Sequence, residues 1–377
     1  MSFSHRLRAW TVLPTIALVL ASCGSTTPSG GTASSVNAAT FGSKEPSFKP
    51  LCTPAAGKQY KVALIIAQGG LGDQSYNDLA YSGFQKAKAD FPVVGRVIQS
   101  ADIVSQGQAI VQQAGQANFD LVIDLEFSTY DAVKAAAPQF PSTQWMTPNF
   151  DSLAANDTGY LFNEQDGSYL AGALAALVTQ DSKIPGITPS KTIGAIGGVK
   201  AVGIDKFLVG YTQGARDIDS GMKVLINYSN SFGDPAKGKQ LADAMFSQGA
   251  NVVYQVAGGT GTGVIQAAQA ANKYAVGVDS DQDAIAPGHV LTSMIKRTDF
   301  AVYDSINRLV CGKLKGGETI NLGLKEGAVG LSQMKFTKNA IPSKYLDKVS
   351  ELQSKIINGQ IKVWNTITQG NPPWFGS

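Results

Sequence analysis

The sequence predicts a two-lobed α/β protein in which each lobe is built on a doubly wound parallel sheet. From residue 61 onward, short β-rich segments alternate with helical stretches, which is the pattern of βαβ units. The alternation occurs in two successive series, so two sheets are expected. Hydrophobic side chains make up 44% of the 377 residues and charged ones only 16%, which is enough apolar content for a sizeable core.

The first series begins with a strand that is followed by a glycine-rich turn. Its elements are the strand KVALIIA with a helix over 75–89, the strand VVGRVIQ with a helix over 104–117, and the strand FDLVIDL with a helix over 130–137. Gly70 and Gly72 resemble the start of a dinucleotide-binding fingerprint, but Ser75 stands where the third glycine belongs. A tight turn in which Asp73 or Ser75 caps the next helix is the better interpretation.

The second series has the same alternation. Its elements are the strand TIGAIGG with a helix over 204–218, the strand MKVLINY with a helix over 235–248, the strand NVVYQVA with a helix over 261–271, and the strand YAVGVDS. In doubly wound sheets, ligands collect at the carboxyl ends of the strands. The loops that follow these strands are therefore expected to form the functional site.

The first residues have the pattern of a cleaved export signal. Arg6 and Arg8 precede an apolar run over 10–20, which is shorter than the roughly 20 residues needed to cross a bilayer. The run ends in Leu-Ala-Ser before Cys23, which resembles the bacterial lipobox, whose cysteine is acylated and becomes the first mature residue. Ordinary secretion with an unmodified Cys23 is the alternative. We expect a signal peptide over 1–22 and an extracytoplasmic protein anchored to the cell membrane by Cys23.

Segment 23–57 and the remaining cysteines fit an exported protein. After Cys23, this segment is rich in Ser, Thr, Gly and Pro without apolar periodicity, as in a flexible tether. Two cysteines remain besides Cys23, namely Cys52 and Cys311. An exported protein meets an oxidising compartment, so a disulfide between them is expected. Two unpaired, buried thiols are the alternative, because the sequence does not give the distance between the two Cα atoms.

Charge and residue inventory exclude several function classes. The formal net charge of +3 falls to +1 once Arg6 and Arg8 leave with the signal, so no nucleic-acid partner is expected. His5 leaves as well, which makes a catalytic triad built on His289 improbable. No Gly-x-Ser-x-Gly elbow and no zinc-ligand spacing occur, so we expect no metal and no cofactor. Segment 233–239 has the glycine and lysine spacing of a phosphate loop, but without the following Ser or Thr.

Several motifs, in order along the chain, carry a family resemblance. They are GGLGDQSYNDLAYSGF, EQDGSYLAGALAALVT, IGAIGG, FGDPAKGKQLA, QVAGGTGTGVIQAA, GVDSDQ, LTSMIKR and LGLKEGAVGL. With them the chain resembles the basic membrane protein family of lipoproteins, which includes purine nucleoside receptors. The resemblance extends from about residue 61 to 331.

The resemblance implies a type I periplasmic-binding-protein fold, with two lobes joined by hinge crossovers, and substrate binding for an ABC importer. The expected N-terminal lobe comprises 58–161 and about 291–323, and the C-terminal lobe comprises 162–290 and about 324–377. A monomer would capture a nucleoside, with purine favoured, and deliver it to a permease and its ATPase.

Four side chains match the family's ligand-binding positions. Tyr76 and Phe207 would sandwich a base, Asp279 would accept hydrogen bonds from the ribose hydroxyls, and Lys296 would donate to the ligand. Each residue also has a plain structural explanation. The two aromatic side chains would fill the core, Asp279 would cap a turn, and Lys296 would be a solvated surface lysine.

Further candidates for ligand binding are Gln68, Asn77, Asn149, Gly258 and Gly259. The two glycines would let backbone approach a ligand at a helix start, although simple turn chemistry explains them equally.

The chain departs from the family at two acidic positions, which are here Ala67 and Asn149. Gln68 and Asn149 are amides, which both donate and accept, so the identity of the base is open. Glu126 would restore an acceptor or would face solvent.

Three other functions remain as alternatives. One is binding of another sugar-containing or planar ligand. A second is an extracytoplasmic nucleoside hydrolase that uses cleft carboxylates, against which the missing second acid and the lack of histidine count. A third is a surface receptor that reports its ligand to a partner.

Overall fold

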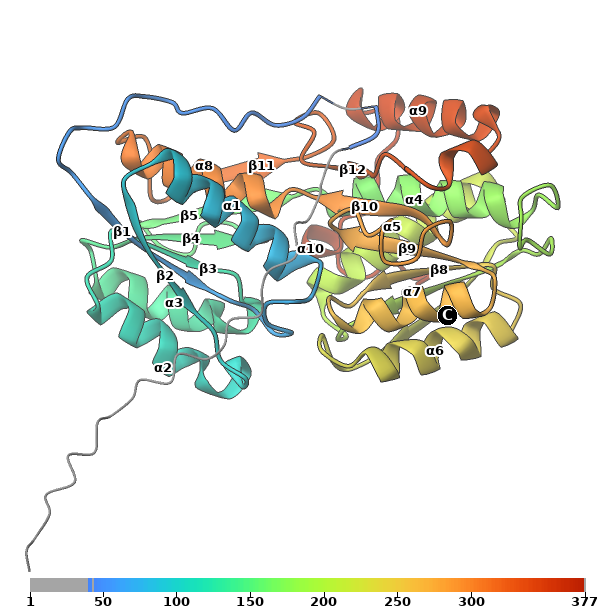
Figure 1. Ribbon diagram of the computed structural model, residues 1–377, viewed down its shortest axis with the longest axis horizontal. Coiled ribbons are helices and arrows are strands. Elements are labelled where there is room, and N and C mark those ends of the chain that lie inside the picture. Colours follow the sequence, from blue (N-terminus) through green and yellow to red (C-terminus); the bar gives the residue numbers. More distant parts are fainter. Residues whose placement is uncertain (1–39, 43, 376–377) are drawn as a thin grey trace, which may run out of the picture. The chain divides into compact units, whose positions relative to one another are not determined.

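The computed structural model describes residues 40–42 and 44–375, so the predicted signal segment and Cys23 lie outside the described part. Within the described residues, the strands form two six-stranded sheets, each covered by helices (Figure 1). This is the arrangement that the two series of βαβ units predict. We call each sheet with its covering helices a lobe.

The first lobe is built on a fully parallel sheet with the order β11-β5-β4-β3-β1-β2. Its strands are β1 (Tyr60–Ile65), β2 (Val93–Ile98), β3 (Leu121–Asp124), β4 (Gln144–Pro148), β5 (Asp157–Phe162) and β11 (Thr319–Leu322). Its helices are α1 (Tyr76–Asp90), α2 (Ile103–Gln116), α3 (Tyr130–Ala136) and α8 (Thr298–Val310). Alternate residues of β1 pack on opposite faces, with Val62 and Leu64 in the main core and Ala63 and Ile65 in the core beneath α2 and α3.

The second lobe has the order β12-β10-β9-β8-β6-β7, in which only β12 runs antiparallel to its neighbour. Its strands are β6 (Thr192–Gly197), β7 (Lys223–Tyr228), β8 (Val252–Val256), β9 (Tyr274–Asp279), β10 (Val290–Lys296) and β12 (Val329–Leu331). Its helices are α4 (Glu164–Thr179), α5 (Val202–Ile218), α6 (Pro235–Ser247), α7 (Thr260–Ala270), α9 (Ser343–Ile357) and the short α10 (Thr366–Gln369). The expected helices over 204–218, 235–248 and 261–271 thus form within a few residues of their predicted ends.

Helices α4 and α5 pack with their backbones in contact. A Cβ atom on Gly172 would lie 1.9 Å from the carbonyl oxygen of Tyr211, and one on Gly214 would lie 2.0 Å from that of Tyr169. Only glycine permits this approach. The close packing fixes α5, and with it Phe207, against the start of α4.

The chain passes between the sheets after β5, after β10 and after β11. The structure differs here from the expected lobe boundary at residue 291, because β10 pairs with β9 and β12 and therefore lies in the second sheet. The motif LTSMIKR has no alternation of polar and apolar residues that assigns it to either sheet. We propose lobe boundaries near residues 163, 297 and 323.

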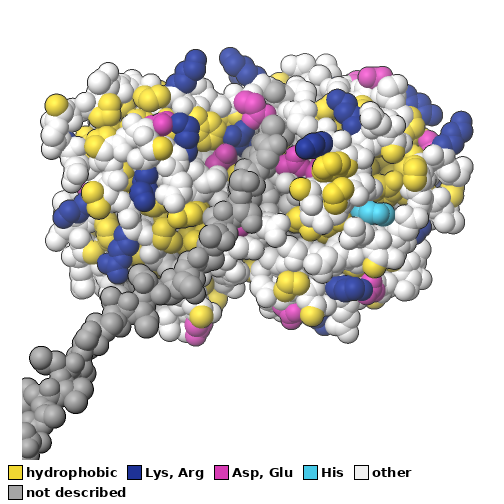
Figure 2. All heavy atoms as spheres, in the orientation of Figure 1, with side chains coloured by type: hydrophobic (Ala, Val, Ile, Leu, Met, Phe, Trp, Pro, Cys, Tyr) yellow, Lys and Arg dark blue, Asp and Glu magenta, His cyan; other side chains and the backbone are white. Residues whose placement is uncertain are grey.

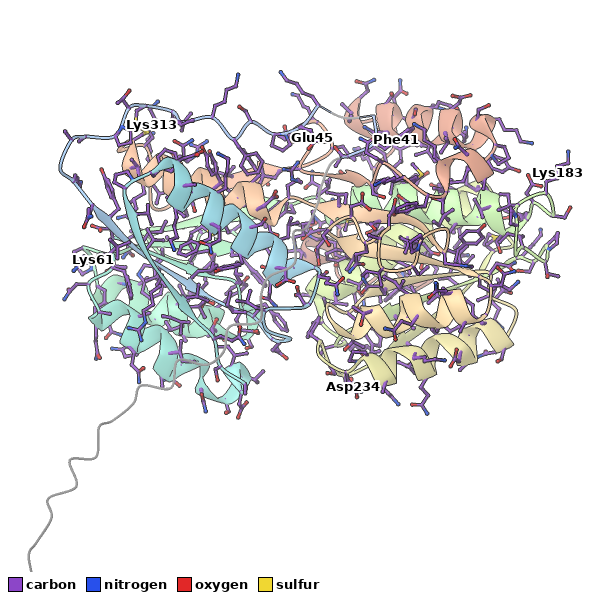
Figure 3. All side chains as sticks on the ribbon, in the orientation of Figure 1. Phe41, Glu45, Lys61, Lys183, Asp234 and Lys313 are labelled. Carbon is purple, nitrogen blue, oxygen red and sulfur yellow. A yellow bond between two sulfur atoms is a disulfide. The ribbon has the colours of Figure 1, made fainter. Side chains whose placement is uncertain are left out.

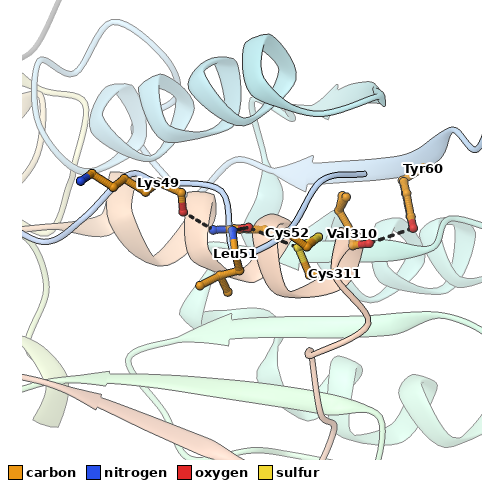
Figure 4. The surroundings of a disulfide bond; sticks show 7 residues. Lys49, Leu51, Cys52, Tyr60, Val310 and Cys311 are labelled. Carbon is orange, nitrogen blue, oxygen red and sulfur yellow. Dashed lines mark hydrogen bonds between the residues drawn. A yellow bond between two sulfur atoms is a disulfide. The ribbon is translucent and has the colours of Figure 1, made fainter. Parts of the chain in front are cut away.

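The segment before β1 runs along α8, to which a disulfide joins it. The structure contains the bond between Cys52 and Cys311, and the Asn307 side chain donates to the Lys49 carbonyl and accepts from the Leu51 amide (Figure 4). Nearer the crossover, Glu45 forms an ion pair with Arg297, and Figure 3 labels Glu45 on this segment. The expectation of a flexible tether up to residue 57 is therefore wrong for residues 45–52, which are held against the first lobe by these bonds.

The surface carries no large patch of one charge on the face that Figure 2 shows, where basic and acidic side chains are interspersed. Within residues 40–42 and 44–375, no helix has both the length and the apolar character that a membrane span requires.

Candidate functional site

A cavity of about 180 Å³ lies where the carboxyl ends of strands from both sheets meet. The predicted residues that line it are Gln68, Tyr76, Asn77, Asn149, Phe207, Gly258, Asp279 and Lys296, together with Ala67 and Glu126. Gly259 is not among the lining residues. The structure therefore brings these separated segments to one site, as expected for doubly wound sheets.

Asp279 is the last residue of β9 and has a left-handed backbone, with φ of 64°. Asp tolerates this conformation better than most residues, which is a structural reason for its presence here. Its side chain is only 6% exposed, and the hydroxyl of Ser75 donates to its Oδ2 at 2.8 Å across the cleft. Burial raises the pKa of Asp279 to about 6, although Lys296 and the Ser75 hydrogen bond act in the opposite direction.

Lys296 ends β10 and directs its ammonium group into the cavity. Its Nζ lies 2.8 Å from Glu164 Oε1 and donates to Asn149 Oδ1 at 2.5 Å. The same ammonium lies 5.2 Å from the ring centre of Tyr76 and 5.4 Å from that of Phe207, within the range of cation–π attraction. Lys296 is thus a buried cation that contacts both lobes.

Tyr76 and Phe207 supply the aromatic surfaces, one from each lobe. Tyr76 begins α1, and its hydroxyl donates to the Leu125 carbonyl at 3.2 Å and accepts from Asn149 Nδ2 at 3.1 Å. Burial raises the pKa of Tyr76 well above its ordinary value, so the hydroxyl stays protonated. Phe207 lies on α5 and is buried. Flat rings facing one cavity suit a planar ligand.

The loop between β1 and α1 is held by its own side chains. Asn77 Oδ1 accepts from the Ala67 amide at 2.9 Å, and Asn77 Nδ2 donates to the Gln68 carbonyl at 3.2 Å. Asp73 caps α1 by accepting from the amides of Ser75 and Asn77, both at 2.9 Å. The expected cap is therefore present, and the Asn77 side chain is engaged with backbone.

Glu126 is fully buried and pairs with Gln68 through two hydrogen bonds. The Gln68 amide donates to Oε2 at 2.8 Å, and Gln68 Nε2 donates to Oε1 at 2.9 Å. Glu126 therefore does not face solvent, which was one of its two expected placements, but lies in the cavity wall with Ala67. An acidic group thus lies next to the position where the family's first acid is missing.

Several lining residues were not predicted from the sequence, among them Glu164, Lys206 and Phe232. Glu164 opens α4 within the motif EQDGSYLAGALAALVT, where a carboxylate at a helix start has an ordinary structural explanation. Phe232 packs edge-to-face with Phe127 from the first lobe, with ring centres 6.4 Å apart. The sequence pattern around Lys206 and Phe232 does not distinguish them from ordinary core or surface residues.

The start of α7 leaves few free donors for a ligand. The Thr260 amide donates to the Phe232 and Ala257 carbonyls, at 3.2 and 3.1 Å, so this helix end is satisfied within the protein. Gly258 has a left-handed backbone, with φ of 52°, and lines the cavity. In the segment that resembles a phosphate loop, Lys239 pairs with Asp243 on the surface. Among the described residues, no cluster of His, Cys, Asp and Glu is suited to a metal ion.

Comparisons with known proteins agree with this architecture. Residues 60–366 match the family model described as PnrA-like ABC transporter substrate-binding protein. A CD4+ T-cell-stimulating antigen of Listeria monocytogenes is 33% identical over 81% of this chain and 88% of its own. An ABC transporter nucleoside-binding protein of Lactococcus lactis is 32% identical over 80% of this chain and 88% of its own.

Among solved structures, a solute-binding protein of an ABC transporter from Aeropyrum pernix aligns with a TM-score of 0.72 and 27% identity, covering 81% of this chain and 93% of that one. The fold is therefore the type I periplasmic-binding-protein fold that the resemblance implied. Substrate-binding proteins of this kind act outside the cytoplasm, bind a small molecule and work with a permease, and they are not enzymes. The chain belongs to the PnrA-like family of ABC transporter substrate-binding proteins.

Proposed function

We propose that this protein captures a nucleoside, with purine favoured, and delivers it to its permease as a monomer anchored by lipidated Cys23. The base would lie between Tyr76 and Phe207, and the ribose hydroxyls would donate to Asp279. The similarity to the nucleoside-binding protein of Lactococcus lactis supports this ligand class.

One observation carries the proposal, namely the pairing of a buried carboxylate with aromatic rings around one cavity. Asp279 accepts a hydrogen bond from Ser75 and has no direct ion pair among the described residues, so its charge is open to further donors. Two vicinal hydroxyls of a ribose supply such donors to the two carboxylate oxygens. The rings of Tyr76 and Phe207 supply the flat surfaces for a base.

Recognition of the base would fall to the wall formed by Glu126 and Gln68. A carboxylate accepts from the N–H groups of a purine edge, and the Gln68 carboxamide can donate as well as accept. Asn149 is less suited to this role, because its bond to Lys296 links the two lobes, whereas Gln68 and Glu126 bond each other within the first lobe.

The lack of an acid at position 67 favours one alternative, which is a sugar-containing or planar ligand other than a common nucleoside. Ala67 leaves the cavity without the acid found in the family, so the hydrogen bonds offered to the base differ.

Transport would proceed through closure of the lobes around the ligand. Hydrogen bonds already cross the cleft, since Ser280 Oγ and Gln282 Nε2 donate to the Gln74 carbonyl at 2.5 and 3.1 Å. Such contacts stabilise a closed form, which the permease would distinguish from the open form.

The test is isothermal titration of the soluble protein, from Gly24 on, with adenosine, guanosine, inosine, uridine, cytidine, free bases and ribose. Micromolar or tighter binding of a nucleoside without turnover supports the proposal. Binding of ribose or bases alone favours the alternative ligand class, and release of free base would identify a hydrolase.

The lipid anchor has its own test. Replacing Cys23 by Ala should move the protein from the membrane fraction to the soluble fraction, and palmitate labelling should disappear. An unlabelled wild-type protein would contradict the anchor.

A further inference from the structure

Three charged side chains form a buried cluster on one side of the cavity, beside the crossings between the lobes. Glu164 Oε1 lies 2.8 Å from Lys296 Nζ, and Glu164 Oε2 lies 2.5 Å from Lys206 Nζ. All three side chains are at most 4% exposed. One carboxylate thus neutralises part of the charge of two buried cations.

The position of this cluster ties it to the hinge. Glu164 follows the crossing after β5, and Lys296 ends β10 just before the next crossing. Lys206, on α5, also donates to the carbonyl oxygen of Phe162, the last residue of β5, at 3.0 Å. Lys206 therefore fixes the carboxylate from one side, which leaves the other oxygen directed at Lys296.

Among the described residues, Glu164 is the anion within ion-pair distance of Lys296, and Asp279 acts on Lys296 without a direct ion pair. The other hydrogen-bond acceptor of Lys296 is the neutral Asn149, and the rings of Tyr76, Phe162 and Phe207 surround the ammonium at 5.1 to 5.4 Å. A buried ammonium needs an anionic partner to offset the loss of water. Burial alone would raise the pKa of Glu164, but the two lysines outweigh it and lower the pKa, which keeps the carboxylate ionised.

We propose that Glu164 is a positioning residue, which holds the Lys296 ammonium at the cavity wall so that it donates to the bound ligand. The ligand part of this proposal rests on the proposed function, whereas the placement of Lys296 by Glu164 does not. Lys206 serves the same arrangement by orienting the carboxylate.

The first experiment measures the affinity of Glu164→Gln for adenosine and guanosine by titration calorimetry. Glutamine keeps the size of the side chain but loses the charge, so affinity should fall about 10- to 100-fold, the range for a hydrogen bond to a charged group. Because an unpaired buried lysine can destabilise the fold, Glu164→Gln with Lys206→Met is measured as well, and it should show the same loss.

A double-mutant cycle separates positioning from a general structural effect. In a Lys296→Met background, Glu164→Gln should change affinity less than about twofold, because the group that it positions is gone. An equal loss of affinity in both backgrounds would overturn the proposal. The control is Asp243→Asn on the same lobe, which removes a carboxylate from the surface ion pair with Lys239, away from the cavity lining, and should leave affinity unchanged.

Ligand-free crystal structures make the proposal independent of the ligand. In Glu164→Gln, or in its pair with Lys206→Met, Lys296 Nζ should move out of hydrogen-bond distance of Asn149. If Lys296 stays in place, Glu164 does not position it, whatever the ligand proves to be. If the wild type binds no nucleoside while Lys296 moves as expected, the nucleoside assignment fails and the positioning role stands.

Discussion

The two lobes contribute different chemistry to the cleft. On the first lobe, the side chains of Asn77, Glu126 and Gln68 are occupied with one another and with nearby backbone. On the second lobe, Asp279 and Lys296 are ionisable groups whose contacts reach across to the first lobe. The first lobe is thus a surface whose side chains hold one another in place, and the second lobe holds the groups that we propose change partners when a ligand enters.

This difference assigns different tasks to the two faces. Groups that already have their hydrogen bonds add shape and selectivity at little cost of reorganisation. A buried carboxylate with room for further donors gains most from a ligand that supplies them. Substitutions on the second lobe are therefore expected to affect affinity more than those on the first.

The largest effect is expected from Asp279→Asn. This change keeps the size and the left-handed backbone but removes the charge, and affinity for ribonucleosides should fall at least about 100-fold, because two charged hydrogen bonds are lost. Calorimetry measures it, with thermal melting to check the fold. Asp281→Asn, two residues further along the same loop, is the matched control and should bind normally. Unchanged affinity in Asp279→Asn would remove the distinction between the lobes.

Lower pH should weaken binding, because the ligand needs the ionised form of Asp279. With a pKa of about 6 for Asp279, affinity at pH 5 should be about tenfold weaker than at pH 7.5. Titrations between pH 5 and 8 measure this change. A flat profile would mean that the ionised Asp279 does not bind the ligand.

The stability of the ligand-free protein should change in the opposite direction. Burial raises the pKa of Asp279 to about 6 and those of Asp73 and Asp124 to about 7, above the ordinary value of 3.8. A carboxyl group whose pKa is higher in the folded than in the unfolded protein stabilises the fold at pH values below its unfolded-state pKa. This stabilisation is lost as the pH rises through the folded-state pKa. The melting temperature should therefore rise as the pH is lowered from 7 to 5. Asp124→Asn should reduce that slope without changing the pH profile of affinity.

A smaller effect is expected at the rings. Phe207→Leu retains an apolar side chain but removes stacking, so affinity for all nucleosides should fall about 2- to 10-fold. Tyr76→Phe, which keeps the ring on the first lobe, should change affinity less than about twofold. The reverse order would show that the Tyr76 hydroxyl, and not the ring surface, carries recognition.

The disulfide should not affect affinity at all. Replacing Cys52 and Cys311 by Ser should lower the free energy of unfolding by about 2–4 kcal/mol, since the bond closes a loop between residues 259 positions apart. Denaturant unfolding measures this loss, and calorimetry should give the wild-type dissociation constant. A large loss of affinity would instead connect the N-terminal segment to the cleft.

Much of the architecture was accessible from the sequence because strand and helix periodicity is local. The helices over 204–218 and 235–248 and the strand YAVGVDS are found within a few residues of where they were predicted. The lobe of β10 was not predictable in this way, since its residues are buried on both faces and show no alternation. Its sheet is decided by pairing with β9, which is a non-local contact.

The candidate site followed partly from the carboxyl ends of the strands and partly from the family motifs. Asp279 and Lys296 end neighbouring strands, so their proximity is a consequence of topology. Glu164 and Lys206 were missed, because their ion pairs arise only when α4 packs against α5 and the crossing after β5. The hydrogen bonds of Asn77 to the backbone could not be predicted either, since the motif does not distinguish a residue that binds a ligand from one that holds a loop in place.

The central claim is that the sugar of a nucleoside binds Asp279 while its base lies between the rings. Calorimetric titration of the wild-type soluble protein with guanosine and with 2′,3′-dideoxyguanosine tests it directly. The account predicts micromolar or tighter binding of guanosine and at least about 100-fold weaker binding of the dideoxy analogue, because the carboxylate then lacks both donors. Equal affinity for the two compounds, or binding of neither, would contradict it.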